Sequence, residues 1–219
     1  MSLESRKSQL ADPGAEWMDQ VVSFWQRYQR VVLGSLAVIA VVGAGTFFTL
    51  RSRASQEDLA SGKLAEADVL YWQGDYARSL QVARDVAQQY GATPSGIDAH
   101  RIAGDAAYWS GDFKTAVAEY QQYLAHQKSG VLADAARRSL AYSYESGGQP
   151  AQAVPIYDQL VGVFDRESSA EFLMAGARCE ARMHQPAEAM KRLQRLADEF
   201  GDASLAGRAR EMMGELSAH

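Results

Sequence analysis

The sequence predicts an all-α protein in which a single transmembrane helix is followed by a stack of about four helix pairs and a capping helix. Three observations predict it: an apolar run near the start, a pattern that recurs about every 37 residues after it, and a body rich in Ala, Leu, Gln and Glu. These residues favour helices. The body also lacks the alternating Val/Ile runs that are typical of half-buried strands.

The chain is expected to divide into four segments. Residues 1–30 form an N-terminal tail with an amphipathic segment, and residues 31–50 form the transmembrane helix. Residues 51–59 are either a linker or a continuation of that helix, and residues 60–219 form the helical domain. With 219 residues and 47% apolar content, the chain is long enough for one compact domain besides the membrane helix.

The apolar run contains 20 uncharged residues, from Val31 to Leu50. A helix of this length spans about 30 Å, which matches the hydrocarbon core of a bilayer. Within the run, Ala40 and Ala44 have the spacing that lets two membrane helices pack closely. Aromatic and cationic residues typical of the membrane–water interface lie at its ends. These anchor residues are Trp25, Tyr28, Arg30, Phe47, Phe48 and Arg51.

Two other kinds of segment have a comparable apolar run: a buried core helix and a cleaved signal peptide. A core helix seldom has so long a stretch without a polar face. A signal peptide has a shorter apolar stretch and small residues at its cleavage site, whereas Arg51 and Arg53 follow here. A membrane anchor is therefore expected. The segment before it, around Trp17 and Phe24, is either an amphipathic turn on the membrane surface or the same helix continuing.

Charge is distributed unevenly along the chain. Residues 1–53 contain six Lys/Arg and four Asp/Glu, a net +2, and residues 54–219 contain 16 and 23, a net −7. An acidic body without a basic stripe argues against nucleic acid as a partner, because affinity for phosphates comes mainly from Lys and Arg. Four Lys/Arg precede the apolar run and three follow it closely. The positive-inside rule therefore favours a cytoplasmic N-terminus and a periplasmic body in a bacterial inner membrane.

An internal repeat is the strongest pattern in the body. The segment Tyr71-Trp72-Gln73-Gly74-Asp75-Tyr76 returns as Tyr108-Trp109-Ser110-Gly111-Asp112-Phe113. The marker positions of four copies are Gly74, Gly111, Gly148 and His184. Five residues after each marker comes a small residue, and four residues further comes a second position with a packing role. The former are Ser79, Ala116, Ala153 and Ala189, and the latter are Ala83, Tyr120, Tyr157 and Leu193.

The spacing has a physical explanation. A glycine permits the left-handed turn that ends one helix, and a proline suits the first turn of the next. Small residues on the second helix let two backbones approach. One such hairpin cannot bury its own apolar face, so several must stack to form a core.

This pattern resembles the tetratricopeptide repeat (TPR) family, in which a glycine lies twelve residues before the small residue and an aromatic residue four after it. Gly104, Ala116 and Tyr120 fit best, whereas Ala67 and Ala177 replace the glycine in the first and fourth copies. The resemblance covers about residues 60–200, with Ala203–Ser217 as a polar-faced capping helix. It implies a right-handed α-solenoid.

The resemblance also implies that partner proteins lie against the first helix of each pair. The expected groove residues are Asp68, Tyr71, Trp72, Arg101, Asp105, Tyr108, Trp109, Arg138, Tyr142, Arg178 and Arg182, with Glu145 beside them. Tyr, Trp and Arg are enriched in binding hot spots. Tyr71 and Tyr108 fit a core position equally well. The paired Lys and Asn with which some TPR domains clamp a C-terminal carboxylate are missing.

No motif for catalysis is present. The sequence has no Gly-x-Ser-x-Gly, no phosphate-binding loop, no Cys-x-x-Cys and no His-Glu-x-x-His. Cys179 and His184 are five residues apart, and a packed thiol beside a turn is the expected reading. We therefore expect no enzyme activity, no cofactor and no metal.

A short tail, one membrane helix and a TPR body together resemble the ancillary TPR subunit of the bacterial Sec translocon, and the anchor region Trp17–Arg53 takes part in that likeness. Two functions follow as expectations. The protein is either a chaperone-like or translocon-associated adaptor for exported polypeptides, or a structural accessory subunit of a large respiratory, secretory or photosynthetic membrane complex. Its partners would be proteins and membrane lipid.

Overall fold

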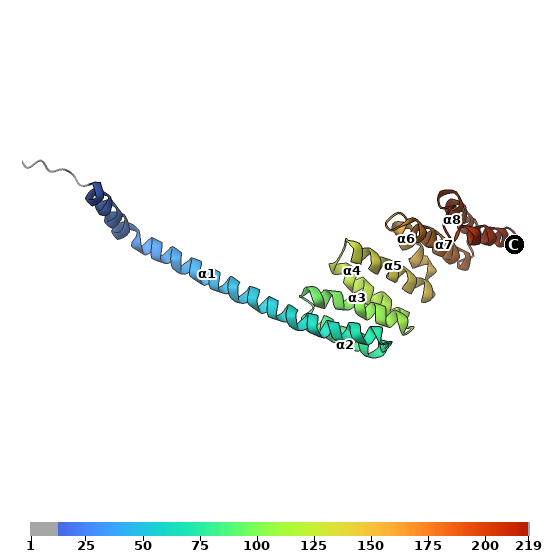
Figure 1. Cartoon of the computed structure of the whole chain (residues 1–219), viewed down its shortest axis with the longest axis horizontal. Coiled ribbons are helices and arrows are strands. Elements are labelled where there is room, and N and C mark those ends of the chain that lie inside the picture. Colours follow the sequence, from blue (N-terminus) through green and yellow to red (C-terminus); the bar gives the residue numbers. More distant parts are fainter. Residues whose placement is uncertain (1–12, 219) are drawn as a thin grey trace, which may run out of the picture. The chain divides into compact units, whose positions relative to one another are not determined.

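The computed structural model describes residues 13–218, and there it contains helices and no strand, as expected (Figure 1). The helices are α1 (Pro13–Trp72), α2 (Tyr76–Tyr90), α3 (Pro94–Trp109), α4 (Phe113–His126), α5 (Val131–Ser146), α6 (Pro150–Leu160), α7 (Arg166–Arg182), α8 (Pro186–Glu199) and α9 (Ala206–Ser217). The chain divides into two compact units, and the second begins at Ser55.

The first unit contains the apolar part of α1. The helix is unbroken from Pro13 onward, so the segment around Trp17 continues into the apolar run. This helix is long and apolar enough to cross a membrane, and no residue of its most apolar window is buried within the protein. Large apolar side chains along it, such as Val41 and Phe48, are exposed.

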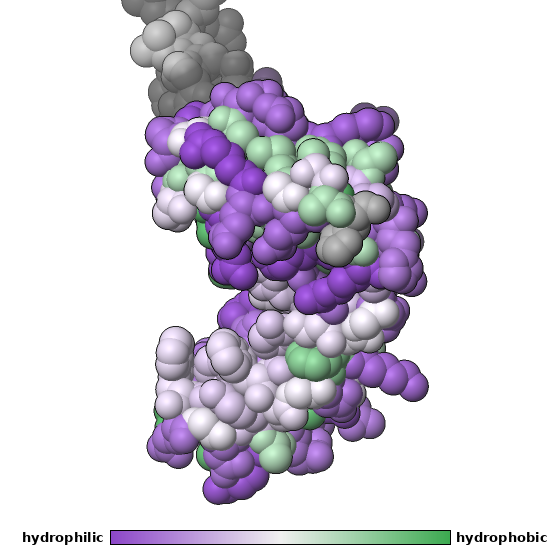
Figure 2. All heavy atoms as spheres, turned by 90° about the vertical axis from the view of Figure 1, so that its right-hand side faces the viewer, coloured by the Kyte–Doolittle hydropathy of each residue, from purple (hydrophilic) through white to green (hydrophobic). Residues whose placement is uncertain are grey.

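The second unit is a stack of helix hairpins. Each helix packs against the next one along the chain, from α2 to α9, and the last turns of α1 pack against α2 and α3 (Figure 1). The first helices of the pairs are therefore the end of α1, α3, α5 and α7, and the second helices are α2, α4, α6 and α8. The face seen in Figure 2 is mostly polar, with apolar residues in small separate patches.

The turns within the hairpins have the predicted conformation. Gly74, Gly111 and Gly148 have φ angles of 81°, 81° and 73°, in the left-handed region. The fourth marker, His184, has a φ of 57° and is the only non-glycine residue with positive φ in the described part of the chain. Helix starts follow at once: the Asp75 carboxylate accepts from Arg78 N at 3.3 Å, which caps α2.

The interior includes the residues that the repeat pattern selects. All eight positions after the markers are buried: Ser79, Ala83, Ala116, Tyr120, Ala153, Tyr157, Ala189 and Leu193. Gly104 faces the Tyr120 ring so closely that a Cβ on it would lie 2.8 Å from that ring. A glycine is thus required where α3 meets the large aromatic side chain of α4.

Ion pairs on buried carboxylates join neighbouring hairpins. Arg84 of α2 donates to Glu119 of α4 at 2.6 Å, and His100 Nδ1 of α3 lies 2.7 Å from the same carboxylate. Further along, Arg192 of α8 donates to Glu180 of α7 in its own hairpin at 2.9 and 3.1 Å and to Asp158 of α6 in the preceding hairpin at 3.2 Å. A buried carboxylate needs such partners because its hydration is lost.

The capping helix begins later than expected. α9 starts at Ala206 rather than at Ala203. The reason is the preceding turn, where the Glu167 carboxylate of α7 accepts from Ser204 N at 3.1 Å and from its hydroxyl at 2.9 Å. Ala203 is buried in the last core cluster, and α9 adds Ala206 and Ala209 to it.

Candidate protein-binding groove

A pocket opens between adjacent first helices of the stack, where α3, α4 and α5 meet. Its volume is about 280 Å³. We call it the central pocket. Its lining residues are Asp105, Tyr108, Trp109, Tyr120, Arg138, Ser139 and Tyr142. Five of these are among the expected groove residues, so the repeat spacing brings them together.

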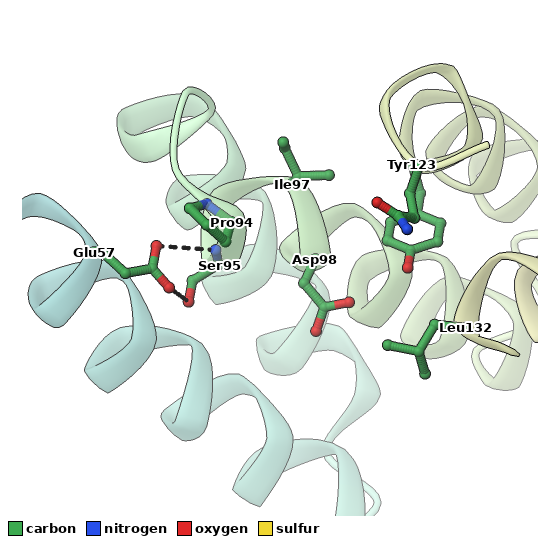
Figure 3. A pocket seen from close by; sticks show the side chains of 8 residues that line it. Glu57, Pro94, Ser95, Ile97, Asp98, Tyr123 and Leu132 are labelled. Atoms are coloured by element: carbon green, nitrogen blue, oxygen red, sulfur yellow. Dashed lines mark hydrogen bonds between the residues drawn. The ribbon is translucent and has the colours of Figure 1, made fainter. Parts of the chain in front are cut away.

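A second hollow, of about 520 Å³, lies beside the start of α3 (Figure 3). Here the Glu57 carboxylate of α1 accepts from Ser95 N at 3.1 Å and from Ser95 Oγ at 2.6 Å. These bonds satisfy the first turn of α3. Asp98 also lines this hollow, which continues the groove towards α1.

Several carboxylates lie close to Arg101, next to the central pocket. Arg101 donates to Asp98 at 2.9 and 3.0 Å and to Asp105 at 3.3 Å. Burial raises the pKa of Asp105, although the Tyr120 hydroxyl, 2.6 Å away, and Arg101 both favour its charged form. Asp98 and Asp68 add to the rise because they are negative charges nearby.

Arg138 has different surroundings, although it occupies the repeat position equivalent to Arg101. Within residues 13–218 it forms no ion pair or hydrogen bond, and its guanidinium carbon lies 5.5 Å from the centre of the Phe164 ring. An arginine over an aromatic face retains its donors for a ligand. Arg138 is therefore the groove arginine that is most available.

Arg178 and Arg182 of α7 share one buried carboxylate. Arg178 donates to the two Glu145 oxygens at 3.2 and 3.3 Å, and Arg182 lies 3.5 Å from one of them. The Tyr157 hydroxyl donates to the same carboxylate at 2.7 Å. Two guanidinium groups thus face a single carboxylate at this end of the groove.

Part of the chain matches a known repeat. Residues 136–165 match the family model of the tetratricopeptide repeat, and this stretch runs from the middle of α5 through α6 to the turn before α7. The chain therefore contains a tetratricopeptide repeat in this stretch.

Solved structures with TPR-like repeats have a similar fold. Two of them are crystal structures of a kinesin light chain candidate of Podosopora anserina with nearly identical TPR-like repeats. Both are 18% identical to this chain with a TM-score of 0.59, and the matches cover 74% of this chain and 85% and 86% of those chains. At this identity the likeness concerns the fold alone. No curated protein matches the sequence.

TPR domains generally serve as non-enzymatic scaffolds, so the body of this chain is a protein–protein interaction adaptor. The described part of the chain contains no group of His, Cys, Asp or Glu that could hold a metal ion. Cys179 is buried, and burial followed by the nearby Glu145 charge raises its pKa to about 11. A thiol with that pKa is a poor nucleophile near neutral pH.

Aromatic side chains of α1, α2 and α3 form a series of ring contacts that ends at Trp109 of the central pocket. The Tyr71 ring centre lies 5.4 Å from that of Trp72 and 5.6 Å from that of Tyr76, which stacks on Trp109 at 6.4 Å. Trp72 is 83% exposed and lines none of the larger pockets. Tyr108 combines the two roles that the sequence left open, because it packs against the core and lines the central pocket.

Several groove residues were not selected from the sequence. They are Asp98, Tyr120, Ser139 and Glu171, of which Glu171 accepts from the Tyr142 hydroxyl at 2.7 Å. Helical spacing contains a signal for two of them. Asp98 is three residues before Arg101, and Glu171 is seven residues before Arg178, so each shares a helix face with an expected groove residue. Tyr120 was expected only to fill the core.

Proposed function

We propose that this protein is a membrane-anchored adaptor that holds other proteins in the groove of its TPR domain, in a chaperone-like or translocon-associated role. The observation that supports this most is the central pocket. It places Arg138, which has no ion pair or hydrogen bond to any of residues 13–218, together with the 59% exposed Trp109 on adjacent first helices. Both are residue types that dominate binding hot spots. The role is binding rather than catalysis.

The anchor in this proposal is Val31–Leu50. Its length, its apolar composition and the absence of burial along it support a bilayer as its surroundings. The proposal places the N-terminus in the cytoplasm and the TPR domain in the periplasm of an inner membrane. Proteinase K added to intact spheroplasts should then digest the TPR domain, and a protected domain would refute this orientation.

Photo-crosslinking in cells tests the adaptor role. Benzoylphenylalanine in place of Trp109 should capture partner polypeptides, while the same residue in place of Gln194, exposed on the second helix α8, should not. Arg138→Ala should reduce the capture at position 109. Equal capture at both positions would refute a groove-based adaptor.

The same experiment separates the adaptor from a structural accessory subunit. An adaptor should yield many captured species that dissociate during mild detergent extraction. A permanent subunit should yield one partner that co-purifies in fixed stoichiometry and resists Arg138→Ala.

A further inference from the structure

We propose that the TPR groove selects an extended polypeptide segment whose charges are separated. Such a segment has Lys or Arg at one end, a large apolar or aromatic side chain in the middle, and Asp or Glu at the other end. This inference rests on the proposed function and specifies the partner that the groove accepts.

The end of the groove formed by α1 and α3 has an excess of negative charge. Three carboxylates, those of Asp68, Asp98 and Asp105, surround the single guanidinium of Arg101, a net charge of −2. Arg101 donates to Asp98 and Asp105, and no hydrogen bond to Asp68 is present in the described part of the chain. A cationic side chain of a partner would compensate the carboxylate of Asp68.

The end of the groove formed by α5 and α7 has the opposite excess. Arg178 and Arg182 contact the carboxylate of Glu145, while Arg138 and Glu171 both lie near Tyr142, so these five charged side chains of α5 and α7 carry a net charge of +1. Arg138 is unpaired in the part of the chain that the structure describes, and the side chain of Arg182 is 56% exposed with one contact at 3.5 Å. Free guanidinium donors match the two oxygens of a carboxylate.

The central pocket lies between these two ends. Tyr108 and Trp109 of α3 and Tyr142 of α5 form aromatic walls around about 280 Å³. That volume is at the lower limit of ligand pockets, so it suits one large side chain and not a bulky folded surface. A partner residue in this pocket would fix the register of the charged residues on either side.

Geometry sets the spacing of the three features. Packed helices are about 10 Å apart, and an extended chain advances about 3.3 Å per residue. From α3 past α5 to α7 is therefore about 20 Å, or about six residues. The basic and acidic groups of the partner should be separated by roughly that number, with the large side chain midway.

Two peptides of the same composition test the proposal. A fluorescein-labelled peptide of about nine residues carries Lys-Arg, Gly-Ser, Tyr, Gly-Ser and Asp-Glu in that order, matching the six-residue spacing. Its isomer has one cationic and one acidic residue at each end. Anisotropy with the full chain in detergent should show about tenfold tighter binding of the charge-separated peptide at low salt, and the ratio should fall in high salt. Equal affinities would overturn the proposal.

Variants that remove one charge from the protein show which end of the groove binds which end of the peptide. Arg138→Gln should weaken the charge-separated peptide about threefold to tenfold, with no effect on a peptide whose Asp-Glu is replaced by Ser-Ser. Asp68→Asn should weaken it similarly, with no effect where Lys-Arg is replaced by Ser-Ser. Exposed residues outside the groove supply the matched controls, Arg210→Gln and Asp198→Asn, which should leave both affinities unchanged.

Two results contradict the inference in different ways. If the variants affect both peptide ends alike, the groove does not separate charges. If the charge-separated peptide does not bind at about millimolar concentration, the inference also fails. In both cases, crosslinking of partners at position 109 would still support the adaptor role, so the two proposals fail independently.

Discussion

Arg101 and Arg138 show how two residues at equivalent repeat positions acquire different roles. Arg101 is held by Asp98 and Asp105, and its side chain is 24% exposed. Arg138 has only the Phe164 ring beneath it, within the described residues. Arg101 therefore stabilises the domain, whereas Arg138 is available to a partner.

Alanine at each position separates these roles. Arg101→Ala should lower the free energy of unfolding by about 1–2 kcal/mol, because charged hydrogen bonds are lost and three carboxylates remain together. Arg138→Ala should lower it by less than about 1 kcal/mol. Urea unfolding of the full chain in detergent, followed by circular dichroism, measures both. A larger effect of Arg138→Ala would contradict this division.

The sequence predicted that the first helices of successive pairs lie side by side in the stack, but not how their side chains pair. The 37-residue spacing aligns Arg101 and Asp105 of one helix with Arg138 and Tyr142 of the next, because each repeat has the same geometry. It did not show that Arg101 is neutralised by Asp98. That pairing depends on side-chain directions along one helix face, which composition and repeat length do not specify.

At the scale of the helix and its turn, the four markers form one series with one exception. Gly74, Gly111 and Gly148 adopt the left-handed conformation without steric cost, whereas His184 adopts it with a Cβ. The left-handed conformation costs a non-glycine residue about 1–2 kcal/mol of conformational free energy. The turn between α7 and α8 is therefore strained relative to the other three.

Glycine substitution should relieve that strain. His184→Gly should raise the free energy of unfolding by about 0.5 kcal/mol, because part of the steric gain is offset by the greater freedom of glycine in the unfolded chain. Gly111→Ala, the matched reverse change, should lower it by about 1 kcal/mol. Chemical unfolding measures both changes, and a destabilising His184→Gly would show that the imidazole makes a favourable contact.

The Glu119 carboxylate makes the stability of the packing between α2, α3 and α4 depend on pH. Burial alone would raise its pKa, but His100 and Arg84 outweigh burial, and the pKa is below the ordinary value of 4.5. A lowered carboxylate pKa adds stability that is present above the ordinary value and is lost as the pH falls through the folded-state value.

Glu119→Gln should remove this contribution. The difference in melting temperature between the natural chain and Glu119→Gln should be full above the ordinary carboxyl pKa of 4.5 and should vanish once the pH has fallen through the lowered folded-state pKa of Glu119. Thermal unfolding by circular dichroism across this range measures it. Asp198→Asn, at an exposed site, is the control. A difference that persists in acid would show that shape rather than charge is responsible.

Element boundaries were predictable where a backbone rule applies. Helices α2 and α4 begin after Gly-Asp, and α6 and α8 begin at Pro150 and Pro186, as the repeat indicated. The start of α9 was wrong by three residues, from 203 to 206. It depends on a bond from Ser204 to Glu167, a residue 37 positions earlier, and such a long-range contact leaves no local sequence signal.

At the scale of the whole domain, the interior is a series of clusters rather than one core. One cluster joins α1, α2 and α3, and another joins α7, α8 and α9, with two between them. In such a stack each repeat depends mainly on its neighbours. Local opening at one end should therefore leave the other end protected.

Leu193→Ala tests this independence. Leu193 is fully buried in the last cluster, so its truncation should destabilise that region by about 2–5 kcal/mol. Hydrogen exchange followed by mass spectrometry should show faster exchange in α7–α9 and little change in α2 and α3. Ala83→Gly in the first cluster should give the reverse pattern, and a uniform increase would indicate a single cooperative unit.

The buried carboxylate of Glu145 limits which arginines of the domain an acidic ligand can bind. It is buried, and it depends on Arg178 for its best counter-charge while the Tyr157 hydroxyl ties it to the interior. An acidic ligand group that binds Arg178 would leave the buried Glu145 carboxylate without its main counter-charge. Breaking a buried ion pair of this kind costs about 3–5 kcal/mol before solvent screening. Weakly binding acidic groups therefore do not bind Arg178, and they bind arginines such as Arg138 that no buried carboxylate requires.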